Sequence, residues 1–109
     1  MVDVTDTNTD LVQSARAFFA AKLAHEIDPA DLAAARAAGN PPIVVDTRSA
    51  AAWDQGHLPG ALHIPGGELR LRADAELPDR GAYIVGYCWG PGCNGATRAG
   101  CTLSDMGYH

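Results

Sequence analysis

The sequence predicts an α/β fold with a mainly parallel sheet, because short apolar segments alternate with segments of helical character along its 109 residues. The clearest strand is residues 43–45, an Ile-Val-Val run of the all-apolar, β-branched kind that lies buried in parallel sheets. Residues 82–87 form a second apolar run, and residues 61–64 form a weaker one between two Pro-Gly pairs. In such sheets, ligands bind at the carboxyl ends of the strands.

Two helices are expected ahead of the first strand. Apolar side chains recur at helical spacing over residues 11–23, behind polar residues 7–10 that include N-cap candidates. A second helix is expected to begin at Pro29 with Asp28 as its N-cap, and to end before Gly39. We therefore predict an N-terminal helical extension over residues 1–25 and a main domain over residues 26–109.

The connections between the strands differ in character. Residues 49–55 are expected to form a short helix, and residues 68–80 are expected to form a loop. A final helix is expected over residues 96–106, closed by Gly107. Helices between strands are what a parallel sheet requires.

The composition describes an ordinary globular protein, with 47% hydrophobic and 19% charged residues. The formal net charge of −5 disfavours nucleic acid and anionic membranes as partners, because no basic stripe is available to displace counterions. The acidic start is unlike a signal peptide, and no apolar run is long enough to span a membrane. Three cysteines, an odd number, predict free thiols in a reducing cytoplasm.

Cys88 is the residue that indicates chemistry most directly. It follows the apolar run at 82–87 and opens the glycine-rich residues 89–95, Trp-Gly-Pro-Gly-Cys-Asn-Gly, ahead of the final helix. A strand, a tight loop and a helix in this order direct backbone N–H groups and a helix N-terminus at one point. A thiol at that point is expected to have a lowered pKa and to be nucleophilic, which favours sulfur or phosphate chemistry.

Two segments resemble the signatures of rhodanese-like domains. The first matches the pattern D-x-R, an aromatic, then G-H-I-P-G-A-x-x-I-P, and comprises residues 45–48 (Val-Asp-Thr-Arg), Trp53 and residues 56–65 (Gly-His-Leu-Pro-Gly-Ala-Leu-His-Ile-Pro). The second comprises Tyr87-Cys88, the glycine-bearing loop, Arg98-Ala99, Leu103 and Gly107-Tyr108. They occur in the family's order, from about Asp28 to the end of the chain.

The resemblance implies an open, mainly parallel sheet with helices on both faces, and a sulfurtransferase activity. Cys88 would attack the outer sulfur of a small anionic donor such as thiosulfate and hold it as a persulfide, for removal by a thiol or cyanide acceptor. No metal or organic cofactor is required. The donor's charge would be bound by the loop and the start of the following helix, at Trp89, Gly90, Gly92, Cys93, Asn94, Gly95, Ala96 and Arg98.

Three further residues of the signature are expected to be structural. Asp46 and Arg48 would form an ion pair or brace the loop by hydrogen bonds, and His57 would fix a turn rather than act as a base. Cys93 is either a loop residue without a partner or a second thiol that resolves a persulfide or sulfenate as a disulfide. Cys101 is given no chemical role. The other histidines are too scattered for a metal site: His25, His63 and His109.

The chain departs from the family pattern in two places. The family's loop is compact and carries Arg or Lys, whereas residues 89–97 here have no charge, so we expect a wider pocket that relies on backbone N–H groups and Arg98. Family members also continue past the Gly-Tyr pair with another strand and a helix, whereas this chain stops at His109. We expect either a truncated product or a second copy, as in a homodimer, that covers the exposed sheet edge.

Two other functions are open alternatives. A cysteine phosphatase or arsenate reductase is disfavoured because it needs His-Cys, five residues and Arg, whereas here Tyr87 precedes Cys88 and Asn94 stands at the Arg position. A non-catalytic module that binds a partner or carries sulfur within a larger pathway is the second alternative. The loop without charge favours it, and the cysteine nucleophile opposes it.

Overall fold

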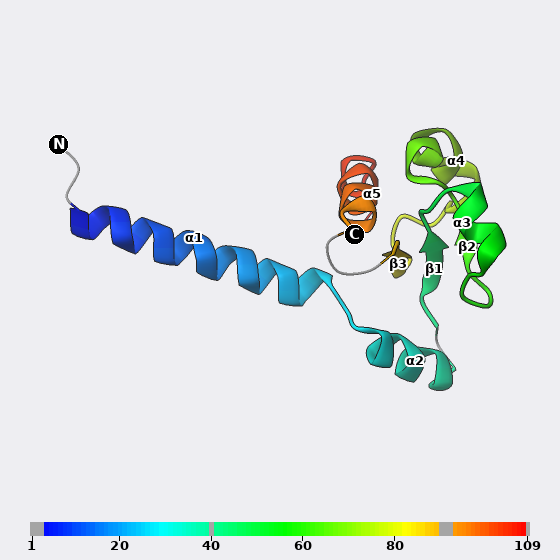
Figure 1. The fold of residues 1–109 in the computed structure, drawn as a ribbon, viewed down its shortest axis with the longest axis horizontal. Coiled ribbons are helices and arrows are strands. Elements are labelled where there is room, and N and C mark those ends of the chain that lie inside the picture. The colour runs from blue at the N-terminus through cyan, green and yellow to red at the C-terminus, as the bar shows by residue number, and fades with distance from the viewer. Residues whose placement is uncertain (1–3, 40, 90–92, 109) are drawn as a thin grey trace. The chain divides into compact units, whose positions relative to one another are not determined.

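The computed structural model describes residues 4–39, 41–89 and 93–108, with their side chains from residue 8 onward. The chain divides into two compact units, Met1–Gly39 and Asn40–His109. Figure 1 labels the elements of both. Each unit is described by itself, and the single domain expected over residues 26–109 stays a prediction.

The first unit holds two helices, α1 (Val4–His25) and α2 (Pro29–Ala37). The expectation that residues 7–10 cap α1 is wrong, because the helix begins at Val4 and runs through them; residues 4–10 contain neither Gly nor Pro to stop it. The start of α2 is as expected, since the Asp28 carboxylate accepts a hydrogen bond from the Asp31 amide at 2.9 Å. Gly39 follows the helix with a φ of +81°, a conformation that glycine adopts without steric cost.

The second unit contains a three-stranded sheet of β1 (Ile43–Asp46), β2 (Leu62–His63) and β3 (Ile84–Tyr87). All pairs are parallel, and the strand order is β2-β1-β3. Asp46, the last residue of β1, lies opposite both His63 and Tyr87. The carboxyl ends of all three strands therefore meet at one edge, which confirms the parallel sheet that the sequence predicts.

Four helical segments connect the strands and close the unit. These are α3 (Ala50–Gln55), the 3-10 turn η1 (Gly66–Glu68), α4 (Leu69–Glu76) and α5 (Gly95–Asp105). Ser49 caps α3 by accepting a hydrogen bond from the Ala52 amide at 3.3 Å. The final helix is confirmed over almost the expected range, and Gly107 follows it with a φ of +92°.

The expected loop at residues 68–80 is wrong, because most of it forms α4. Leu69, Ala73 and Leu77 recur every four residues and are all buried, so they present one apolar face to the core. Burial of that face outweighs the charged residues between them.

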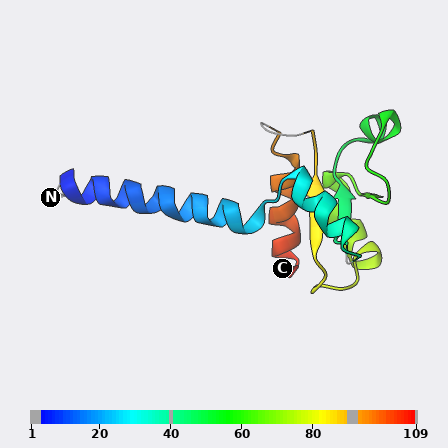
Figure 2. The ribbon, with the colours of Figure 1, turned by 90° about the horizontal axis from the view of Figure 1, so that it is seen from below.

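The core of the second unit lies between the sheet and the pair α4 and α5. Figure 2 shows α5 running beside β3, and α4 packs against α5. The buried cluster comprises Val45, Ile64, Leu69, Ala73, Leu77, Ala99, Leu103 and Tyr108. Val44 and Val45 point to opposite faces of β1, and both are buried, so both faces of the central strand are covered.

Tyr108 fixes the end of the described chain to α4. Its hydroxyl lies within hydrogen-bond distance of the Ala73 and Leu77 carbonyl oxygens. The Arg80 guanidinium lies over the Tyr108 ring at 4.5 Å and donates to the Met106 carbonyl at 3.0 Å. These contacts hold α5 against the core and so fix the position of its first turn.

Candidate active site

Cys88 directly follows β3, at the edge where the carboxyl ends of the strands meet. Its side chain is half-buried, and its thiol donates a long hydrogen bond to the Cys93 carbonyl oxygen, with a sulfur–oxygen distance of 3.7 Å. The first residue of α5 is Gly95, whose missing side chain leaves room for the sulfurs. A Cβ at position 95 would lie 3.8 Å from the sulfur of Cys88 and 3.6 Å from the sulfur of Cys93. Both thiols therefore lie against the start of α5.

Cys93 is the thiol whose contacts lower its pKa. Its pKa lies below the ordinary value, first because the Cys88 side chain hydrogen-bonds its sulfur, and then because the backbone N–H groups of Trp89 and Gly95 donate to it. Slight desolvation opposes this shift. Cys93 is thus not an isolated loop residue. The inward-pointing amides expected around Cys88 are, in the described residues, directed at its neighbour.

Asp46 is a buried carboxylate that holds neighbouring residues of the site in place through hydrogen bonds. It is fully buried and accepts hydrogen bonds from the Arg48 amide at 2.9 Å, the Arg48 guanidinium at 2.8 Å and the Tyr87 hydroxyl at 2.8 Å. Burial acts to raise the pKa of this carboxyl, but the hydrogen bonds from Arg48 and Tyr87 outweigh it, so the pKa is lowered. The same surroundings raise the pKa of Tyr87, first through burial and then through its bond to Asp46. Asp46 is therefore ionised, and both of its carboxylate oxygens accept hydrogen bonds.

Arg48 connects Asp46 with Trp89, the residue that follows Cys88. Its guanidinium carbon lies 4.7 Å from the centre of the Trp89 ring and 5.4 Å from the Tyr87 ring. It also donates to the Gly56 carbonyl at 2.7 Å. Trp89 is 66% exposed, so its ring stands at the surface beside Cys88 and is held by the cation beneath it. This position suits a wall of a binding site.

His57 forms part of an aromatic stack beside the site. Its Nδ1 lies 3.0 Å from the Trp53 carbonyl oxygen, and its ring stacks on the Trp53 ring with 3.3 Å between centroids. The ring of His63 also stacks on Trp53, at 4.7 Å, and its Nε2 lies 2.8 Å from the Arg48 carbonyl oxygen. His57 thus makes both of these contacts with Trp53, and its expected role of fixing the turn stays a prediction. The place of His63 in this stack was not expected, because it depends on the sheet register that sets His63 opposite Asp46.

The remaining predicted residues lie at the start of α5 or outside the described residues. Asn94 is the N-cap of α5 and is exposed, and Ala96 is half-buried in the first turn. Arg98 is exposed one turn further on, and its guanidinium has no hydrogen-bond or ion-pair partner among the side chains that the structure describes. Gly90 and Gly92 lie outside the described residues.

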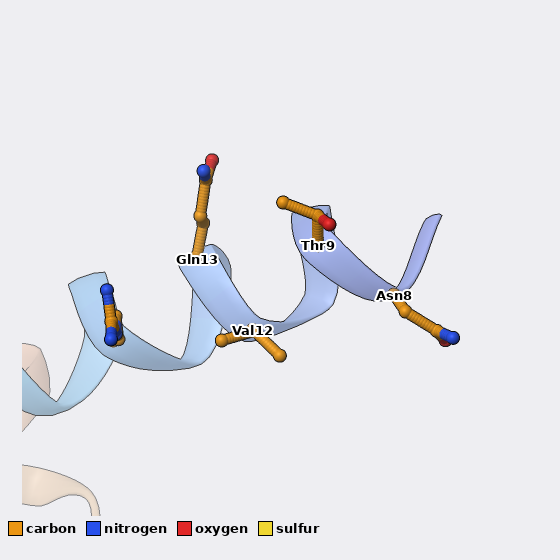
Figure 3. A pocket seen from close by; sticks show the side chains of 5 residues that line it. Asn8, Thr9, Val12 and Gln13 are labelled. Carbon is orange, nitrogen blue, oxygen red and sulfur yellow. The ribbon is translucent and has the colours of Figure 1, made fainter. Parts of the chain in front are cut away.

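Other kinds of site find little support. Across residues 4–39, 41–89 and 93–108, no three His, Cys, Asp or Glu side chains gather as they would around a metal ion. The hollow in Figure 3 is lined by residues of α1 alone, and Asn8, Thr9, Val12 and Gln13 diverge from the helix there. Side chains that diverge on one helix do not enclose a ligand, and this hollow adds no site.

The comparison with protein families decides which family the strand–cysteine–helix arrangement represents. The family model described as "Rhodanese-like domain" matches residues 28–109, well over half of the chain. The chain belongs to the rhodanese-like domain family. Comparison with curated proteins found no significant match.

A solved structure supports the same assignment for this rhodanese-like domain. The crystal structure of the BH2092 protein from Bacillus halodurans is 36% identical and superposes with a TM-score of 0.74. The match covers 89% of this chain and 71% of that chain. In addition, none of the helices in the described part of this domain is long and apolar enough to span a membrane.

Proposed function

We propose that this rhodanese-like domain is a sulfurtransferase, which moves a sulfane sulfur from a small anionic donor such as thiosulfate to a thiol or cyanide acceptor. The observation that carries the proposal is the position of Cys88, half-buried at the carboxyl end of a parallel strand and beside the first turn of α5. Family membership supports the same chemistry. The three cysteines are free thiols, which is usual in a reducing cytoplasm, and we propose that the domain acts there.

The proposed reaction begins with the Cys88 thiolate. Its sulfur attacks the outer sulfur of thiosulfate, the new sulfur–sulfur bond forms, and sulfite leaves with the electron pair of the bond that breaks. The acceptor then attacks the outer sulfur of the persulfide and regenerates the thiolate. The chemistry needs only a nucleophile and a site that favours an anion.

Three features of the site suit an anionic donor. The N-terminus of the eleven-residue helix α5 carries a partial positive charge, and the glycine at position 95 lets the donor approach it closely. Arg98 adds a full positive charge one turn away and has no described carboxylate competing for it. Trp89, stacked on Arg48, supplies the apolar wall.

Thiocyanate formation from thiosulfate and cyanide tests the proposal. We expect the purified chain to form thiocyanate, Cys88→Ser to form none, and Cys101→Ser to match the unchanged chain, because Cys101 is exposed on α5 away from the two paired thiols. Mercaptopyruvate in place of thiosulfate compares the two donors. A folded, reduced protein without activity on either donor overturns the proposal and leaves a non-catalytic or sulfur-carrier module. Hydrolysis of a phosphate ester would instead indicate a cysteine phosphatase.

A further inference from the structure

Two thiols, rather than one, occupy the start of α5. Cys88 and Cys93 are five positions apart, and both sulfurs lie against Gly95. The Cys88 thiol also donates to the Cys93 carbonyl oxygen, which ties one side chain to the backbone of the other. The third cysteine, Cys101, is exposed and has no such contact among the described residues. A pair of adjacent thiols can do chemistry that a single thiol cannot.

We propose that Cys93 is the resolving thiol of the Cys88 persulfide, so that the domain releases the sulfane sulfur as hydrosulfide and becomes a Cys88–Cys93 disulfide. This inference rests on the proposed sulfurtransferase function, because it begins from the persulfide. It assigns to the domain a reductive outcome that a single cysteine would not give.

The step balances in atoms and electrons. The Cys93 thiolate attacks the Cys88 sulfur, a bond forms between the two cysteine sulfurs, and the bond from Cys88 to the sulfane sulfur breaks. The sulfane sulfur leaves with the electron pair as hydrosulfide and is thereby reduced by two electrons. The two cysteines are oxidised together to the disulfide. A small dithiol reductant such as dithiothreitol returns the disulfide to two thiols for the next turnover.

Three observations support Cys93 as the attacking group. Its sulfur and the Cys88 sulfur lie beside the same glycine, 3.6 Å and 3.8 Å from where a Cβ at position 95 would stand, and the Cys88 sulfur is 3.7 Å from the Cys93 carbonyl oxygen, so the two cysteines are neighbours. The backbone N–H groups of Trp89 and Gly95 donate to it and stabilise its thiolate, which is the reactive form. Glycine at position 95 leaves the space beside both sulfurs free of a side chain, where the departing sulfur can be accommodated.

The test uses reduced protein, freed of reductant, with thiosulfate as the only added reagent and oxygen excluded. Sulfite and sulfide are measured, and the protein is then cleaved after arginine. Residues 81–98 form one peptide that contains Cys88 and Cys93 but not Cys101. For the unchanged chain we expect sulfite and sulfide in roughly equal amounts, and a peptide about 2 Da lighter than the dithiol form.

The variants separate this inference from the proposed function. We expect Cys93→Ser to release sulfite but no sulfide, and to keep a peptide about 32 Da heavier at Cys88. We expect Cys101→Ser to behave as the unchanged chain does. Sulfite without sulfide from the unchanged chain, with the persulfide retained, overturns this inference and leaves the proposed function intact. No sulfite from either chain overturns both. The mass of the unchanged peptide is decisive by itself, even if Cys93→Ser does not fold.

Discussion

Removal of the Tyr87 hydroxyl should weaken the fold through the buried carboxylate that it supports. In Tyr87→Phe, Asp46 keeps its bonds from Arg48 but loses the donor at 2.8 Å, and the Leu58 amide loses its acceptor at 3.1 Å. A hydrogen bond to a charged group contributes about 1.5–3 kcal/mol. Because Arg48 still neutralises the carboxylate, we expect a loss of about 2 kcal/mol in the free energy of unfolding near pH 7. For a unit of this size, that loss lowers Tm by about 8–16 °C.

The cost of Tyr87→Phe should also depend on pH, because the hydrogen bond that it removes is made to an ionisable carboxylate. The pKa of Asp46 is lowered in the fold, so the stability that its ionisation contributes is complete above the unfolded value of about 4 and is lost as the pH falls through the folded value. Once Asp46 is protonated, the Tyr87 hydroxyl bonds a neutral group, and its contribution falls to about 1 kcal/mol. We therefore expect the effect of Tyr87→Phe to shrink by about half at acid pH.

Urea unfolding followed by the fluorescence of Trp53 and Trp89 measures both effects. Tyr83→Phe is the matched control, since Tyr83 precedes β3 and is exposed. Tyr87 does not support the Asp46 carboxylate if Tyr87→Phe costs no more than Tyr83→Phe near pH 7, or if its cost is unchanged once Asp46 is protonated.

Three other predictions follow from the same structure. Leu77→Ala removes a fully buried side chain just after α4 and should cost about 2–5 kcal/mol in urea unfolding, whereas exposed Leu71 within α4 should tolerate the change at under about 0.5 kcal/mol; equal costs would refute the assigned core face. Gly95→Ala should fold, because its Cβ meets only ordinary contacts of 3.4 Å or more, but should slow thiocyanate formation at least about tenfold by filling the space beside the sulfurs. Gly100→Ala on the same helix is open to solvent and should leave the rate unchanged; a Gly95→Ala rate equal to that of Gly100→Ala would contradict the geometry. Alkylation of Cys93 should outpace that of Cys101 near neutral pH, because a lowered pKa gives Cys93 more thiolate at that pH, and Cys88→Ala, which removes the hydrogen-bond donor, should slow it; an unchanged rate would show that Cys88 does not acidify Cys93.

The fold was predictable wherever neighbouring residues decide the structure. The Asp28-Pro29 start of α2 and the β-branched run of β1 are local signals, and both elements form where expected. The helix α4 was missed although Leu69, Ala73 and Leu77 carry its period, because four charged residues among them resemble a loop. That these three side chains form the buried face of the segment is seen only in the structure.

The sequence suggests which residues belong to the candidate site, but it does not reveal the contacts between them. Cys88, Asp46 and Arg48 can be found by their positions at strand ends. The role of Tyr87 depends on the register that sets it opposite Asp46, and the stack of His63 on Trp53 depends on the path of the chain between β1 and β2. The amides that donate to Cys93 are a property of the folded loop, which the sequence does not encode in any single residue.

A persulfide at Cys88 is common to the proposed function and to the proposed role of Cys93. The decisive measurement is the mass of peptide 81–98 from Cys93→Ser after treatment with thiosulfate, since this variant cannot resolve the persulfide as a disulfide. We predict a gain of about 32 Da that is located on Cys88 and reversed by cyanide. A folded, reduced Cys93→Ser protein whose peptide gains no mass would contradict it.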